Sequence, residues 1–82
     1  MFWQSISSAP YDPVTTDGPL HYGRWVRVRN GDLEATARWR QEITLYSPQV
    51  GHNLKRYPAW YGLDDQAIAF DPTHWAELDE QP

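Results

Sequence analysis

The residues of this chain best suited to chemistry are three histidines, His21, His52 and His74, and the carboxylate of Asp71. Histidine exchanges protons near neutral pH, so His74 with Asp71 three residues before it is the first catalytic candidate. A hydrolase would also need a nucleophile and an oxyanion site, and no G-x-S-x-G or comparable motif is present. A terminal strand with Trp75 in the core and His74 at the surface is the simpler interpretation. We therefore expect a non-enzymatic protein.

The same histidines could in principle bind a metal ion. They are far apart in the sequence, without the H-x-H or H-x-x-x-H spacing that places two ligands on one face. The chain has no cysteine, which excludes a disulfide framework and cysteine-ligated zinc modules. We expect no metal ion and no cofactor.

Anion binding by arginine is the other chemistry that the sequence suggests, and it depends on a β-hairpin at 24–41. Asn30-Gly31 favours a type I′ turn, because both central residues need a positive φ. The turn then pairs Val28 with Leu33 and Arg27 with Glu34, which separates apolar from charged residues on the two faces.

Extending this register predicts the composition of each face. The apolar face holds Tyr22, Val26, Val28, Leu33, Ala35, Ala37 and Trp39, and the opposite face holds Trp25, Arg27, Arg29, Glu34, Arg38 and Arg40. An outward tryptophan among arginines is typical of a protein–protein hot spot. The same composition also suits single-stranded nucleic acid, which such proteins hold by phosphate contacts and base stacking. Solvated charge pairs, or a loop at 8–20 folded over Trp25, would explain this face without a partner. The predicted contact residues are Trp25, Arg27, Arg29, Arg38 and Arg40.

The rest of the sequence favours short strands separated by turns. Extended segments are expected at 3–6, 41–46, 59–62, 67–70 and 73–78, a loop at 8–19, and an irregular excursion at 47–58 with room for one helical turn. We predict a mainly β fold: one domain, 1–82, with a small antiparallel sheet or meander of four to five strands.

Size and composition limit the remaining possibilities. A chain of 82 residues buries only about 60–65% of its unfolded surface, so five Trp, five Tyr and two Phe must supply most of its core. A monomer or a homodimer joined through exposed aromatics is expected. No apolar run could span a membrane and no signal peptide is visible, which predicts a cytoplasmic protein.

The charges are unevenly distributed along the chain. All seven Lys and Arg lie between Arg24 and Arg56, where three acids oppose them and leave a net charge of +4. Residues 57–82 carry six acids and no basic residue. This acidic third could imitate nucleic-acid phosphate and inhibit a host nuclease, or serve plain solubility.

Two terminal motifs carry a resemblance to a known family. Trp3, Ile6, Ala9-Pro10 and Asp12 form W-x-x-I-x-x-A-P-x-D, and Pro72-Thr73-His74-Trp75 forms P-T-H-W. This combination resembles a family of small uncharacterised bacteriophage and prophage proteins. The resemblance implies a bacterial host and no particular activity. We therefore expect a phage-type accessory protein that binds a macromolecular partner, most simply a protein, with nucleic-acid binding and nuclease inhibition as alternatives.

Overall fold

The computed structural model describes residues 2–47 and 51–82, and within them the chain forms nine short strands and one 3-10 turn. The strands are β1 (Gln4–Ser5), β2 (Thr15–Asp17), β3 (Leu20–Tyr22), β4 (Val26–Asn30), β5 (Leu33–Arg40), β6 (Ile43–Ser47), β7 (His52–Arg56), β8 (Ala59–Gly62) and β9 (His74–Glu77), and the 3-10 turn is Ile6–Ser8. Every strand pair is antiparallel. The predicted mainly β antiparallel fold is confirmed.

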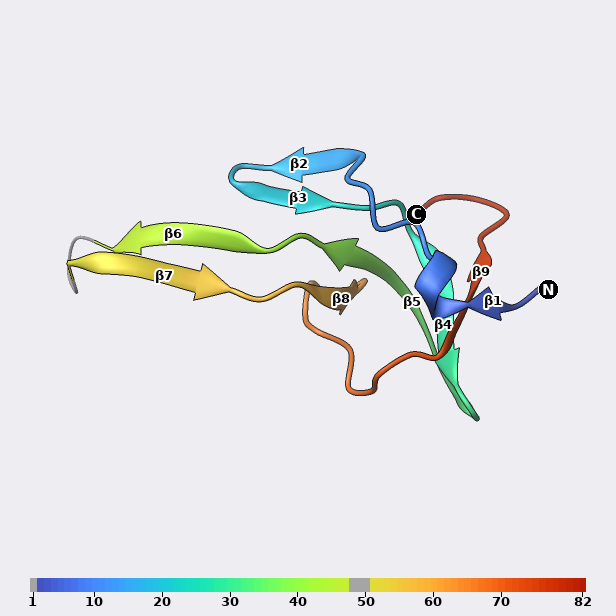
Figure 1. Ribbon diagram of the computed structural model, residues 1–82. Coiled ribbons are helices and arrows are strands. Elements are labelled where there is room, and N and C mark those ends of the chain that lie inside the picture. The colour runs from blue at the N-terminus through green and yellow to red at the C-terminus, as the bar shows by residue number, and fades with distance from the viewer. Residues whose placement is uncertain (1, 48–50) are drawn as a thin grey trace.

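The longest strand, β5, organises the sheet. The strands follow the order β1-β9-β4-β5-β3-β2, and β8 also pairs with β5 (Figure 1). The first half of β5 pairs with β4, and its last four residues pair with β8. The strand count exceeds the expected four to five, because the expected loop at 8–19 contains β2 and the expected excursion at 47–58 contains β7.

The central hairpin, β4–β5, forms with a turn one residue later than predicted. Asn30 pairs with Leu33, so Gly31-Asp32 is the two-residue turn and each strand residue meets a partner two positions further along β5. Gly31 has φ of +60°, as the first central position of a type II′ turn requires. Asn30 stays in the ladder, where its Nδ2 donates to the Asp71 carbonyl oxygen at 2.9 Å. A shift of two residues keeps every side chain on its predicted face of this hairpin.

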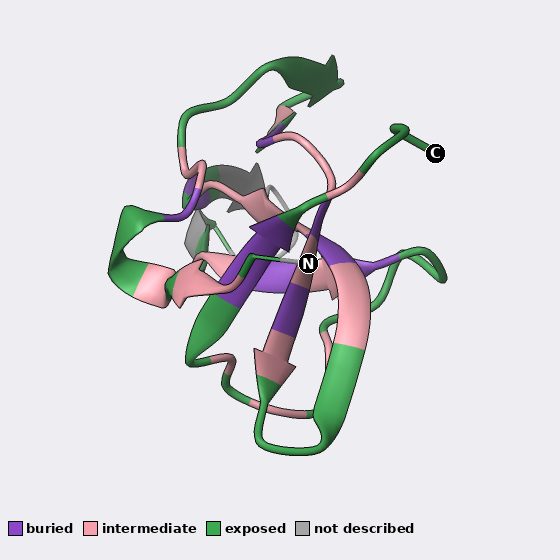
Figure 2. Ribbon diagram, turned by 90° about the vertical axis from the view of Figure 1, so that its right-hand side faces the viewer, coloured by how far each residue is buried: buried purple, intermediate pink, exposed green. Residues whose placement is uncertain are grey.

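The hydrophobic core lies on one face of the sheet. Val26, Val28 and Ala37 are fully buried there, as the face prediction requires, and Trp60 and Trp75 are almost fully buried (Figure 2). Partly buried residues from 6–11 and 68–70 cover this cluster. Leu33 lies next to the turn and is 57% exposed, which makes its predicted place in the core wrong.

The two terminal motifs lie side by side. Gln4 pairs with Trp75, and the Ile6 amide donates to the Thr73 carbonyl oxygen at 3.0 Å. The Trp75 indole N–H donates to Ser8 Oγ at 3.1 Å. A buried indole N–H needs such an acceptor, so this bond fixes both ends of the chain in one core.

A second hairpin, β6–β7, extends away from the sheet (Figure 1). Its register continues that of β5–β8: Arg40 pairs with Ala59, and three residues further on Ile43 pairs with Arg56. The two ladders therefore form one long hairpin, interrupted at Gln41-Glu42 and Tyr57-Pro58. Pro58 lacks an N–H for the ladder, which explains the interruption. The expected irregular excursion is wrong at 52–56, and its residues 48–50 lie outside the described residues.

The last third of the chain is less regular than expected. Strands β8 and β9 confirm the segments predicted at 59–62 and 73–78. The segment predicted at 67–70 contains a single bridge, from Ala67 to Tyr61, instead of a strand. A tight turn after β8 places Asp65 at φ of 61°, and this turn brings the chain back over the core.

Candidate functional site

The four predicted arginines share the sheet face opposite the core. Arg27 pairs with Thr36 and Arg29 with Glu34, and alternation along β5 adds Arg38 and Arg40 to the same face. One arginine therefore stands at each of four successive same-face positions. We call this set, in the order Arg29, Arg27, Arg38 and Arg40, the arginine stripe. At about 3.4 Å per residue, neighbours on one strand are about 7 Å apart, the diagonal step from Arg27 to Arg38 is about 7–8 Å, and the stripe is about 20 Å long.

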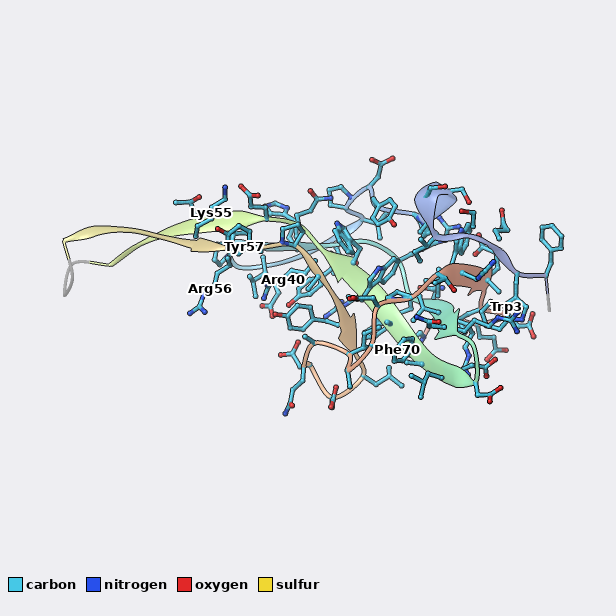
Figure 3. The ribbon with its side chains drawn as sticks, turned by 60° about the horizontal axis from the view of Figure 1, so that its bottom comes forward. Trp3, Arg40, Lys55, Arg56, Tyr57 and Phe70 are labelled. Atoms are coloured by element: carbon cyan, nitrogen blue, oxygen red, sulfur yellow. The ribbon has the colours of Figure 1, made fainter. Side chains whose placement is uncertain are left out.

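Aromatic rings hold the guanidinium groups of the stripe. The Arg38 guanidinium carbon lies 3.8 Å from the Tyr22 ring centroid and 4.6 Å from that of Trp25. Arg29 lies 4.6 Å from the Trp3 centroid, which extends the stripe to the end of the domain opposite Arg40 (Figure 3). Such cation–π contacts restrict a flexible side chain without neutralising its charge.

Arg40 and Arg27 have polar partners as well. Arg40 lies 4.3 Å from the Tyr61 centroid, and its Nη2 donates to the Tyr57 carbonyl oxygen at 2.9 Å. Arg27 donates from Nη2 to Glu34 Oε2 at 3.1 Å and from Nη1 to Thr36 Oγ1 at 3.1 Å. The Glu34 carboxylate is thus bound by an arginine of this face.

Most of the positive charge on this face is unpaired. In the part of the chain that the structure describes, the ion pairs join Arg24 to Glu77, Arg27 to Glu34 and Lys55 to Glu42. Arg29, Arg38 and Arg40 therefore have no acidic partner among the described residues. The stripe with Glu34 carries a net charge of +3 in a protein of net charge −4.

Two polar atoms of the stripe are buried without a partner. Nε of Arg38 and Nε of Arg40 have no hydrogen-bond acceptor among the described residues. An unsatisfied buried donor costs about 1–3 kcal/mol, so the fold gains no stability from these two atoms. Both residues are only half-buried; Nη2 of Arg40 already donates to Tyr57, and the remaining Nη donors are the groups left for a partner.

Trp25 lies on this face as predicted, and it is half-buried. Besides Arg38, its neighbour is the C-terminal segment: the Gln81 side chain accepts from the Trp25 amide at 2.8 Å and donates to its carbonyl oxygen at 2.9 Å. The partners that the structure shows for Trp25 are thus Arg38 and Gln81. The alternative that a loop at 8–20 covers Trp25 stays a prediction.

Tyr22 corrects the predicted division of the faces. It pairs with Arg40, where the sequence predicted Trp39, and it is buried under Arg38 on the arginine face. Residues 23–25 separate β3 from β4, so alternation cannot be counted through them. Burial raises the pKa of the Tyr22 hydroxyl above its usual 10.0, and the negative charge of Asp65 raises it further, against the two arginines of β5.

The sequence did not assign three of these aromatic residues to the site. Tyr22 was expected on the apolar face, and Trp3 and Tyr61 were counted only among the aromatic residues expected to supply most of the core. Only the cross-strand register brings these rings to the arginines. Tyr61 pairs with Arg38. Ser5, two residues after Trp3, pairs with His74, which in turn pairs with Arg29. Such neighbours come from strands distant in sequence, which local patterns do not reveal.

His74 lies at the surface of a terminal strand, as the simpler interpretation of the sequence predicted. His74 is exposed and Trp75 is buried, as alternation in β9 requires. The His74 Nδ1 lies 2.9 Å from Thr73 Oγ1, so its hydrogen-bonding partner is this hydroxyl. Across the described residues, no group of three or more His, Cys, Asp or Glu is arranged to hold a metal ion.

The acids of residues 57–82 belong to several parts of the structure. Asp64 and Asp65 lie in the turn after β8, Asp71 precedes β9, and Glu77 pairs with Arg24. The remaining two, Asp79 and Glu80, belong to the C-terminal segment. Imitation of nucleic-acid phosphate by these acids stays a prediction.

Comparison with protein-family models, curated proteins and solved structures found no match for this chain. The resemblance of its terminal motifs to phage and prophage proteins stays a prediction. Among the described residues, none of the helical structure is long and apolar enough to cross a membrane.

Proposed function

We propose that this protein is a non-enzymatic accessory protein, of phage or prophage type, that binds a protein partner in the bacterial cytoplasm. The contact surface is the arginine stripe with Trp25. The observation that carries the proposal is the gathering of three unpaired guanidinium groups, each held on an aromatic ring, on one sheet face.

The main core does not contain these arginines. Val26, Val28 and Ala37 are buried on the opposite face, whereas on the arginine face Arg38 covers the buried Tyr22 ring. Like charges placed side by side repel each other, which disfavours the stripe in the free protein. Unpaired like charges gathered on one face, a local arrangement that repulsion disfavours, are typical of a functional surface.

A protein partner fits this face better than single-stranded nucleic acid. Binding of single strands relies on ring faces that are open to the bases. Here an arginine lies against each of the rings of Trp3, Trp25 and Tyr61, which reduces the ring surface open to base stacking. Arginine and tryptophan together are the residues most enriched at protein–protein hot spots.

The test is a pull-down with the tagged protein from bacterial lysate, with and without nuclease treatment, read by mass spectrometry. The Trp25→Ala/Arg27→Ala variant should lose a partner that the wild type retains after nuclease treatment. Arg56→Ala is the matched control, because it removes one positive charge from β7, outside the stripe. Equal recovery by all three proteins would show that the face is not the contact surface. Recovery that disappears with nuclease would replace the protein partner by nucleic acid.

A further inference from the structure

The stripe has a regular spacing that specifies the chemistry of its ligand. We propose that it binds an acidic polypeptide segment in an extended conformation, with carboxylates at alternate residues. This inference rests on the proposed function, since it names the part of the partner that the same face recognises.

The spacing of the stripe is that of an extended chain. Arg29 and Arg27 lie two residues apart on β4, Arg38 and Arg40 lie two residues apart on β5, and the step from Arg27 to Arg38 runs diagonally between the two strands. An extended peptide places side chains of the same side about 7 Å apart, because it also rises about 3.4 Å per residue. A segment of about seven residues with acids at every second position therefore follows the stripe, and the carboxylates next to Arg29, Arg38 and Arg40 each meet an arginine without an ion pair among the described residues.

The guanidinium groups are held ready for such ligands. Arginine presents a planar fork of N–H donors that matches a carboxylate, and a bidentate pair is stronger than a neutral hydrogen bond. The rings of Tyr22 and Trp25 enclose the Arg38 group, and the Trp3 ring supports that of Arg29. A side chain that is already ordered loses less entropy on binding, which increases affinity.

One carboxylate of the chain already uses this surface. Glu34 Oε2 accepts from Arg27 Nη2 at 3.1 Å, on the same face and in the row of Arg29. The pair is partly exposed, with 28% of the Arg27 side chain and 43% of the Glu34 side chain accessible. An incoming acidic segment would extend this arrangement to the unpaired members of the stripe.

The experiment measures binding of three fluorescent probes to the full chain by anisotropy, at one low salt concentration. The probes are a peptide of alternating Glu and Ser, a peptide of the same composition with all Glu in one block, and an oligothymidylate of similar length. We expect the alternating peptide to bind about tenfold more tightly than the block peptide, because a tenfold change in affinity corresponds to about one additional charge-assisted contact. Arg29→Gln and Arg38→Gln should each weaken its binding by about tenfold, whereas Arg56→Gln should change it less than about twofold.

Each other outcome overturns the inference in a distinct way. Equal binding of the two peptides would mean diffuse charge attraction without recognition of spacing. Tighter binding of the oligothymidylate would assign the stripe to nucleic acid. If no probe binds, the proposed extended acidic ligand is wrong, and a pull-down with the Arg29→Gln/Arg38→Gln variant then tests the proposed function. If this variant loses the partner, the stripe is still the contact surface. If it retains the partner, both proposals are wrong. Far-ultraviolet circular dichroism of each variant confirms that it is folded.

Discussion

The stacking of Arg38 between Tyr22 and Trp25 supports the argument for a preformed binding face, and it can be measured as a free energy. A guanidinium–ring contact contributes about 0.5–1 kcal/mol at exposed sites and about 2 kcal/mol when desolvated. Arg38 is half-buried and 4.6 Å from the Trp25 centroid, so we expect about 0.5–1.5 kcal/mol for this pair.

A single substitution would not measure that contribution. Arg38→Gln removes the ring contacts, but it also removes a buried Nε without an acceptor among the described residues, whose burial costs about 1–3 kcal/mol. These two effects have opposite signs and similar size, so the variant's stability could change very little. A double-mutant cycle with Trp25→Leu separates them, because the unsatisfied Nε is lost equally in both backgrounds.

The assay is urea unfolding of the wild type, the two single variants and the double variant, followed by circular dichroism. The expected coupling free energy between Arg38→Gln and Trp25→Leu is about 0.5–1.5 kcal/mol. The control cycle pairs Trp25→Leu with Arg56→Gln, whose β7 position is remote from the ring, and should give additivity within about 0.3–0.5 kcal/mol. A coupling no larger than that of the control would refute the stacked arrangement and the preformed stripe with it.

Three further predictions concern the fold around the site. Gly23→Ala should destabilise the protein by about 1–3 kcal/mol in urea unfolding, because the new Cβ would lie 2.6 Å from a backbone oxygen; Gly62→Ala, whose nearest atom is a movable carboxylate oxygen at 3.1 Å, should change stability by less than about 1 kcal/mol. The free energy of unfolding should fall as pH rises above 10.0, because Tyr22 ionises at a lower pH in the unfolded chain than in the native state. When stability is measured as a function of pH, this fall should be smaller in the Tyr22→Phe variant than in the wild type. Ser8→Ala should cost about 1–3 kcal/mol by leaving the Trp75 indole N–H without its acceptor, and the loss should be smaller in a Trp75→Phe background; equal losses in both backgrounds would contradict the hydrogen bond.

The sequence predicted what alternation and turn chemistry determine locally. The β4–β5 hairpin and both of its faces follow from alternation, and a turn displaced by one residue leaves these faces unchanged. The turn itself was misplaced because Asn30 is held in the ladder by a bond to Asp71, which lies far along the chain. Asn-Gly alone carries no information about such a partner.

The elements that were missed depend on distant pairing. β7 has no strong strand pattern of its own, and it forms where the register of β5–β8 continues past Pro58. Tyr22 was assigned to the wrong face, because β3 is a separate strand with its own register on β5. The candidate arginines and Trp25 were found from one hairpin, whereas Trp3 precedes β1, Tyr22 and Tyr61 belong to β3 and β8, and their contacts with the arginines became visible only in three dimensions.

The division of aromatic residues between the two faces argues that the arginine face has a function of its own. A domain of this size needs large side chains in its core, and Trp60 and Trp75 are buried there. Yet Trp3, Tyr22, Trp25 and Tyr61 lie on the opposite face against arginines. If stability alone were at stake, aliphatic pairs would cover that face without mutual repulsion and without buried Nε atoms that lack acceptors. The rings order the arginines and leave their charge unpaired, which is the state in which a surface recognises an acidic partner.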